Sequence, residues 1–308
     1  SVYNLFEKNN EIDIVGIPIM FFERQEGDHP LNFKFKKESQ IIDILDNPQY
    51  IQMSGPSTFF RSDAIKDVKY DLKIINGVDS LFINKIMLFK KKYGLVGLEA
   101  DAIHYYRRRY AQTSILDLAS NKEGFYTDKL KYYYKYLIDY CIEKEGEVLE
   151  YIQHVVIYSL QHLITKTDFP ESFDKDKIKE FWDYLSYILN HIDENVIINH
   201  KSVGLLAKFF FISFKNKDFH IVADSKKHQV FLKSKDFIIN RLHNHKINID
   251  FVELKNGFLN ISGNIISSCN NDSIYIIAEK KDEQGNIETF KSSYFDYPTR
   301  STQRLLSI

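Results

Sequence analysis

The chain has 308 residues, of which 44% are hydrophobic, and this length and composition allow two domains with apolar cores. Its 41 basic and 42 acidic residues give a formal net charge of -1, which argues against nucleic acid as a partner because nucleic-acid-binding proteins carry a basic excess. Two cysteines without CxxC spacing, Cys141 and Cys269, favour a reducing compartment and no metal role. No apolar run is long enough for a membrane span, so we expect a cytoplasmic protein.

The first part of the chain predicts short elements of mixed type. Residues 1–9 are typical of a helix that stops at two asparagines. Residues 12–22 are rich in Ile, Val and Phe and predict a buried strand. A Gly-Asp-His-Pro turn at 27–30 precedes 33–36, which alternates like an edge strand. Residues 40–45 predict another short strand or a helical turn.

The next segment combines a loop of small residues with an amphipathic helix. Met53–Phe60 predicts a loop followed by a strand, and Arg61–Lys66 a short helix. Asp79 or Ser80 is the expected N-cap of the amphipathic helix, which carries Phe82, Ile86 and Phe89 on one face. Gly94 suits a left-handed C-cap, and residues 95–106 return to strand character.

Helices dominate the middle of the chain, from Thr127 to about Asn199. We expect them at Asp128–Glu145, Glu147–Thr165 and Lys175–His191. We interpret the tyrosines of the first of these as packing residues. They are Tyr132, Tyr133, Tyr134, Tyr136 and Tyr140.

Short alternating runs follow Lys201 and predict a small β-sandwich. Asn256-Gly257 and Gln284-Gly285-Asn286 supply hairpin-type turns between them. The expected strands are Phe219–Val222, Val230–Leu232, Ile247–Leu254, Phe258–Ile265, Ser273–Glu279 and Glu288–Tyr294.

Three features could carry chemistry. A carboxylate at a helix start, as at Asp79, is usually a cap, but it can also act as a general base toward a hydroxyl. On a strand, Arg107 and Arg109 would share one face while Arg108 points the other way, and two guanidiniums suit a diphosphate. The alternative for the arginines is a charged, exposed edge strand. Backbone amides and the hydroxyls of Ser54, Ser57 and Thr58 make the loop a weak third candidate.

The order of these features resembles family 2 glycosyltransferases of bacterial surface-polymer synthesis, the teichoic acid and capsule type. In that family a GPSxF-like segment precedes an E-D-x-x-F motif on a helix, and a strand ending in Y-Y-R-K-R follows. The matching segments here are Gly55–Phe59, Val78–Phe82 and Tyr105–Arg109. Ile14–Pro18 and Phe125–Leu130 also fit the pattern of the family.

The resemblance implies a mixed α/β and β protein. Residues 1–126 would be the C-terminal, acceptor-side half of a GT-A domain, residues 127–205 a helical segment, and residues 206–308 a β-sandwich-like accessory domain. The implied reaction is an inverting transfer of a sugar from a nucleotide-diphosphate sugar to a hydroxyl of a cell-surface polymer. Such an enzyme works in the cytoplasm or at the inner face of the plasma membrane, with peripheral membrane association through its acceptor, and it can form oligomers.

The resemblance also implies residue roles. Asp79 would be the catalytic base. Arg107, Arg109 and Ser114 would bind the donor diphosphate. The acceptor-side loop would comprise Ser54, Gly55, Ser57, Thr58 and Tyr106.

Two departures from the family pattern bear on activity. Val78 replaces the Glu of the acidic pair. The donor-binding half, with the Asp-x-Asp that holds Mn²⁺ or Mg²⁺, would precede residue 1, so we expect a truncated, split or degenerate copy that is inactive alone and whose own residues bind no metal. Asp174-Lys175-Asp176 is the literal Asp-x-Asp here, but paired acids at a helix start complement the helix dipole.

The histidines give no indication of a metal site. His154 and His162 lie eight residues apart on one predicted helix, and His243 and His245 lie two residues apart, without the partners of a zinc site.

A non-catalytic polymer-binding or assembly module is the main alternative to the glycosyltransferase. A partner domain of a phosphotransferase is a further one.

Overall fold

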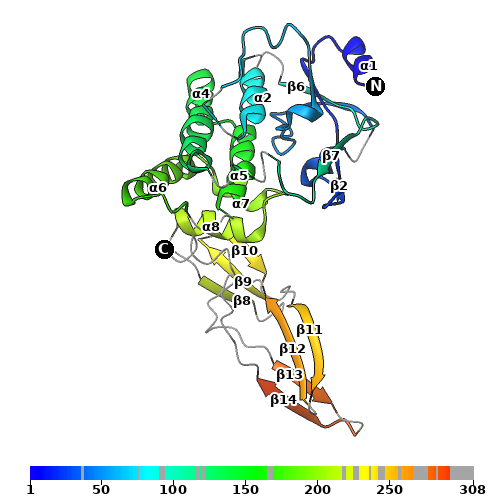
Figure 1. The fold of residues 1–308 in the computed structure, drawn as a ribbon, viewed down its shortest axis with the longest axis vertical. Helices are drawn as coiled ribbons and strands as arrows, with labels where there is room; N and C mark the ends of the chain where they lie inside the picture. The colour runs from blue at the N-terminus through cyan, green and yellow to red at the C-terminus, as the bar shows by residue number, and fades with distance from the viewer. Residues whose placement is uncertain are drawn as a thin grey trace. The chain divides into compact units, whose positions relative to one another are not determined.

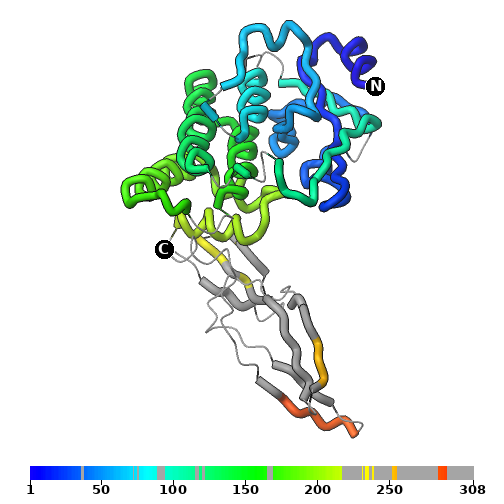
Figure 2. The backbone as a smooth tube through the Cα atoms, viewed as in Figure 1, coloured from blue at the N-terminus to red at the C-terminus, as the bar shows by residue number. Residues whose placement is uncertain are grey.

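The structure is a computed structural model, and it divides the chain into two compact units, residues 1–215 and 216–303 (Figures 1 and 2). It describes all residues except 36–37, 72, 75, 90–93, 115–117, 120–121, 165–168, 217–219, 225–228, 236, 242–246, 256–257, 266–276, 282–283 and 292–308. The first unit contains both the mixed α/β part and the helices. The division expected at 126 and 127 would fall inside this unit and stays a prediction.

A four-stranded mixed sheet opens the first unit, in the order β4-β6-β1-β5. The central strand β1 (Ile14–Gly16) is buried, runs parallel to β6 (Leu95–Leu98) and pairs antiparallel with β5 (Thr58–Phe60). β4 (Gln40–Asp43) covers the other side of β6.

A second sheet has the order β3-β2-β7. β2 (Ile19–Glu23) pairs with β3 (Gly27–Asp28) and runs parallel to β7 (His104–Arg108), with Phe21 opposite Tyr106. The single strand expected at 12–22 is therefore wrong, because this segment breaks and contributes one strand to each sheet. The break in residues 12–22 falls at Pro18, which has no N–H for a ladder. Residues 95–106 have the expected strand character, and they also supply one strand to each sheet.

Two further local expectations fail. The segment expected as an edge strand, 33–36, lies instead in the 3₁₀ helix η1 (Pro30–Phe35), apart from Lys36, which is outside the described residues. Pro30 fixes the backbone angle that starts a helical turn, and Leu31 and Lys34, three residues apart, are both buried. The helix expected at 61–66 is a series of turns.

Helix α2 (Val78–Phe89) confirms the amphipathic segment. Leu81, Ile83 and Ile86 on this helix are almost completely buried. The helix begins directly after Gly77, whose φ of 96° is left-handed, so the expected N-cap at Asp79 or Ser80 is wrong and Asp79 lies in the first turn. A Cβ at Gly77 would also lie 2.9 Å from the ring of Tyr133, which explains why glycine occupies this position.

Residues 127–199 contain the three expected helices. Among the tyrosines expected to pack, Tyr133 and Tyr134 are fully buried, whereas Tyr136 is exposed. A helix at 205–215 was not expected, because most positions in this segment are apolar. It packs against the helices at Lys175–Asn190 and Glu194–Asn199. No helix in the described parts of the chain is long and apolar enough to cross a bilayer. The helices are α1 (Val2–Lys8), the π-helix η4 (Lys129–Lys135), α4 (Tyr136–Glu145), α5 (Glu150–Ile164), α6 (Lys175–Asn190), α7 (Glu194–Asn199) and α8 (Leu205–Lys215).

The described elements of the second unit are antiparallel strands. They form the sheet β10-β9-β8 and the ribbons β11-β12 and β13-β14. Gly285, with φ 88°, lies in the expected turn before β14, whereas the turn at 256–257 is outside the described residues. A sandwich arrangement stays a prediction. The strands are β8 (His220–Asp224), β9 (Gln229–Ser234), β10 (Phe237–Arg241), β11 (Ile247–Lys255), β12 (Phe258–Ile265), β13 (Ile277–Lys281) and β14 (Ile287–Lys291).

Candidate functional site

A cleft of about 490 Å³ in the first unit brings together parts of the chain that are far apart in sequence. It is lined by one face of β2, the loop at 53–56, the first turn of α2, the inner face of β7 and Ser159 of α5. Its polar lining includes His29, Ser54, Asn76, Asp79, Tyr106 and Arg108. A carboxylate, a guanidinium and an imidazole therefore share one cleft.

Asp79 is the acidic residue of this lining. The backbone N–H of Gly55 donates to Asp79 Oδ2 at 3.3 Å, which orients the carboxylate from the neighbouring loop. This is the single protein hydrogen bond of the Asp79 side chain among the described residues, so the carboxylate retains oxygen lone pairs for a ligand. Tyr70 lies nearby: burial first, and then the Asp79 charge, raise the pKa of the Tyr70 hydroxyl.

Arg108 supplies the positive charge of the cleft. Its guanidinium carbon lies 5.2 Å from the ring centre of Phe21 and 5.5 Å from that of Tyr106. Its Nε is buried without a hydrogen-bond partner, and the described residues supply no ion pair for the group. A guanidinium that rests on aromatic faces, with its Nε donor free of described partners, is suited to an anionic ligand.

The other two arginines lie on the opposite side of β7. The alternation along the strand leaves Tyr106 and Arg108 half-buried and Arg107 exposed, with Arg109 exposed just after the strand ends. Arg107 Nε forms an ion pair with Glu23, and this hydrogen bond is the main cause that lowers the pKa of Glu23. Arg107 and Arg109 are both exposed, as expected for residues that share one side of a strand, and Arg108 lies on the other side. The cleft is lined by Arg108 and by neither Arg107 nor Arg109.

The remaining expected site residues have different positions. Ser54 and Tyr106 line the cleft, and Gly55 contacts Asp79. Ser57 and Thr58 are buried beneath the loop, where their side chains contact Ser54 O at 3.3 and 2.6 Å, so they shape the loop rather than line the cleft. Ser114 is half-buried, outside the cleft lining. The binding roles of all these residues stay predictions.

Gln52 holds the loop from below, and the sequence gives no signal for it beyond a polar residue between two apolar ones. Its side chain donates to Thr58 Oγ1 at 2.8 Å and accepts from Lys34 Nζ at 2.6 Å. Burial lowers the pKa of Lys34 to about 7. The Tyr151 hydroxyl accepts the Gln52 backbone N–H at 3.0 Å, which ties the loop to α5.

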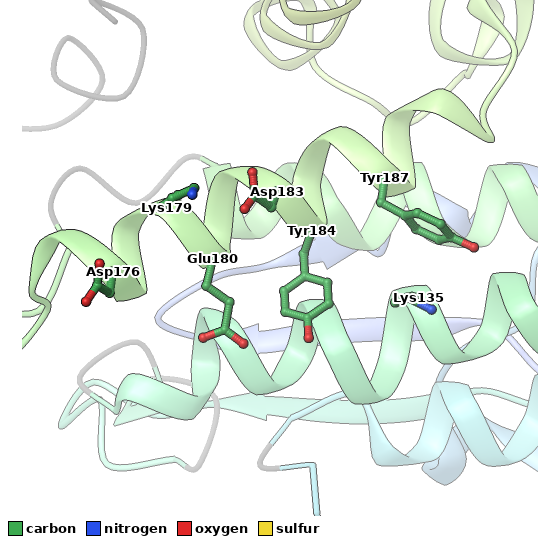
Figure 3. Close-up of a pocket in the computed structure, with 7 residues that line it drawn as sticks. All are labelled: Lys135, Asp176, Lys179, Glu180, Asp183, Tyr184 and Tyr187. Carbon is green, nitrogen blue, oxygen red and sulfur yellow. The ribbon is translucent and has the colours of Figure 1, made fainter.

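A second, more open groove of about 450 Å³ runs along α6 beside Lys135 (Figure 3). Figure 3 shows Tyr184 and Tyr187 directed toward the helix that carries Lys135. The groove contains Asp176, whereas Asp174 caps α6 by accepting the Lys177 N–H at 2.9 Å. The capping role agrees with the interpretation of this Asp-x-Asp as a helix start.

The described residues contain no group of three His, Cys, Asp or Glu side chains placed to hold a metal ion. His154 and His162 both lie on α5, as expected, and His243 and His245 are outside the described residues. In the cleft, one carboxylate beside a guanidinium does not match the several oxygen ligands that Mg²⁺ or Mn²⁺ requires.

The chain is similar to two minor teichoic acid biosynthesis proteins. It is 28% identical to GgaB of Bacillus subtilis (strain 168) over 302 residues, covering 96% of this chain and 33% of GgaB. It is 26% identical to GgaA of the same organism over 234 residues, covering 75% of this chain and 52% of GgaA. The chain thus spans between a third and about half of the length of these relatives. No protein-family model matches it.

Proposed function

We propose that this chain is the acceptor-side part of a family 2, GT-A glycosyltransferase that builds a cell-surface polymer of the teichoic acid type. The observation that carries the proposal is that Asp79 and Arg108, for which the described residues supply no ion pair, line the same cleft. The ordered motifs of the sequence and the similarity to two proteins named for teichoic acid biosynthesis support it. The donor would be a nucleotide-diphosphate sugar and the acceptor a hydroxyl of the polymer, met in the cytoplasm at the inner face of the plasma membrane.

In the proposed reaction, Asp79 and Arg108 have different roles. The acceptor hydroxyl oxygen attacks the anomeric carbon of the sugar while Asp79 takes the hydroxyl proton. The bond from that carbon to the diphosphate oxygen breaks, and the electron pair leaves with the diphosphate, whose charge Arg108 stabilises. Attack opposite the leaving group inverts the anomeric centre.

In this proposal the diphosphate is assigned to Arg108 in place of Arg107 and Arg109. Arg108 lines the cleft, and among the described residues no protein anion pairs with it, whereas Arg107 and Arg109 lie outside the cleft lining. A Mn²⁺ or Mg²⁺ ion stays an expectation of the resemblance. The cleft residues do not fit it, so no step here involves a metal.

The Asp79→Asn variant of the natural gene product tests the proposal, with Asp101→Asn at an exposed position as the matched control. We expect Asp79→Asn to lower the rate of sugar transfer about 100-fold or more, because the amide cannot take the proton. Asp101→Asn should transfer sugar at the normal rate.

The alternative of a non-catalytic polymer-binding module is favoured by the tyrosine-lined groove on α6. It predicts no change in transfer for Asp79→Asn. It also predicts that Tyr184→Ala with Tyr187→Ala abolishes retention of the polymer. That pair of results would replace the enzyme proposal.

A further inference from the structure

His29 is held firmly at the wall of the cleft, and no motif of the sequence singled it out. It follows β3, and its backbone N–H donates to Ile19 O at 3.1 Å. The side chain of Asn32 clamps the same Ile19 by accepting its N–H at 3.1 Å and donating to its carbonyl at 2.8 Å. The imidazole ring of His29 packs near Phe21, with ring centres 5.4 Å apart. The turn and β2 therefore fix the imidazole beside the cleft.

The hydrogen bonds of the ring decide which nitrogen carries the proton. His29 Nδ1 accepts the backbone N–H of Leu31 at 3.1 Å. In a neutral imidazole the proton then lies on Nε2, which becomes a donor. Within the described part of the chain, His29 Nε2 has no protein acceptor. The residue thus offers one fixed N–H donor.

The surroundings keep this imidazole uncharged. Burial, followed by the charges of Lys34, His162 and Arg108, lowers the pKa of His29 to about 4. The ring of Tyr158, centred 6.5 Å from that of His29, belongs to the same environment, where burial raises the Tyr158 pKa to about 12. Near neutral pH, His29 can therefore donate a hydrogen bond, and it does not act as a proton carrier.

We propose that His29 is a substrate-binding residue whose Nε2–H donates to an oxygen of the leaving diphosphate, next to the charge of Arg108. This inference rests on the proposed function. Both residues line one cleft. Arg108 Nε is buried without a partner, and His29 Nε2 forms no hydrogen bond with a described residue, since the ring is held through Nδ1. A neutral donor beside a guanidinium adds a directed hydrogen bond to an anionic oxygen without adding a second charge.

Two amide variants of the natural gene product test the role of each ring nitrogen. His29→Asn keeps an acceptor for the Leu31 N–H but has no group at the position of Nε2, whereas His29→Gln can place an amide N–H near that position. We expect His29→Asn to weaken binding of the nucleoside diphosphate product, measured by calorimetry, and kcat/KM for the donor sugar by about 10-fold or more. The loss in His29→Gln should be several-fold smaller, and KM for the acceptor should stay constant in both.

Equal diphosphate affinity in His29→Asn and the unmodified protein, at matched thermal unfolding midpoints, would overturn the inference. So would equal losses in the two variants, or a change confined to KM for the acceptor. Arg108→Gln, measured in parallel, separates this inference from the proposed function. If Arg108→Gln loses diphosphate affinity while His29→Asn does not, the role of His29 alone is refuted, whereas if neither variant loses affinity the assigned anion site itself fails.

Discussion

Gly55 lies so close to Asp79 that no side chain fits between them. A Cβ at residue 55 would lie 2.8 Å from Asp79 Oδ2, the oxygen that accepts the Gly55 N–H at 3.3 Å. The loop therefore uses its glycine for a close approach to the carboxylate that we assign as the base.

We expect Gly55→Ala to displace this carboxylate and to lower kcat for sugar transfer by about 10- to 100-fold, because small misplacements of a reacting group are costly. The free energy of unfolding should change by less than about 1.5 kcal/mol, since the displaced group is a side chain at a cleft. Gly204→Ala is the control, because its Cβ would meet nothing closer than Gln161 Oε1 at 4.0 Å. Unchanged kcat in Gly55→Ala would show that this contact does not position the base.

Arg107 and Arg108 are neighbours on β7 with opposite surroundings, so they form a matched pair of test sites. We expect Arg108→Gln to lower kcat/KM for the donor sugar by at least about 100-fold, because it removes the charge that faces the diphosphate. Arg107→Gln removes an exposed ion pair with Glu23 and should change kcat/KM by less than about threefold. Steady-state kinetics of both variants decides the assignment, and the reverse order of effects would restore Arg107 as the diphosphate ligand.

We expect the buried pair His154 and His200 to lower the free energy of unfolding in acid. Both are almost completely buried, and their ring centres are 4.9 Å apart. Three of their four ring nitrogens have no hydrogen-bond partner among the residues that the structure describes. Glu150 Oε1 is 3.4 Å from His154 Nε2, but the two atoms are not aligned for a hydrogen bond. Burial lowers the pKa of His154 to about 4, and burial with the neighbouring His154 and Lys208 lowers that of His200 to about 3, from an ordinary 6.5.

Because the pKa values of both histidines are lower in the folded chain, the free energy of unfolding falls as the pH falls. Above pH 6.5 the two histidines are neutral in the folded and the unfolded chain, and their full contribution to stability is present. As the pH falls below 6.5 the unfolded chain takes up protons first, so the free energy of unfolding falls by up to about 1.4 kcal/mol per pH unit for each histidine until their folded pKa values are reached. Urea unfolding between about pH 7.5 and about pH 4.5 measures this slope.

His154→Gln should reduce the slope, whatever its effect on stability at neutral pH. An unchanged slope in His154→Gln would mean that other groups cause the acid sensitivity of the fold.

The sequence by itself determined the features that depend on local periodicity. The spacing of apolar residues located α2 and the three main helices, and it placed Asp79 at a helix start. The alternation of a strand also separated Arg108 from Arg107 and Arg109. These relationships hold within one element, so they can be predicted without knowing its neighbours.

Only the tertiary structure decided which side of each element meets the cleft. The pairing of β7 with β2, with Phe21 opposite Tyr106, turns Arg108 inward, and no property of the segment at 104–109 alone distinguishes the two faces. His29 and Gln52 became visible for the same reason, since their partners Phe21, Lys34 and Tyr151 come from other elements. Burial and charge at a site are sums over neighbours that are distant in sequence, and folding alone brings those neighbours together.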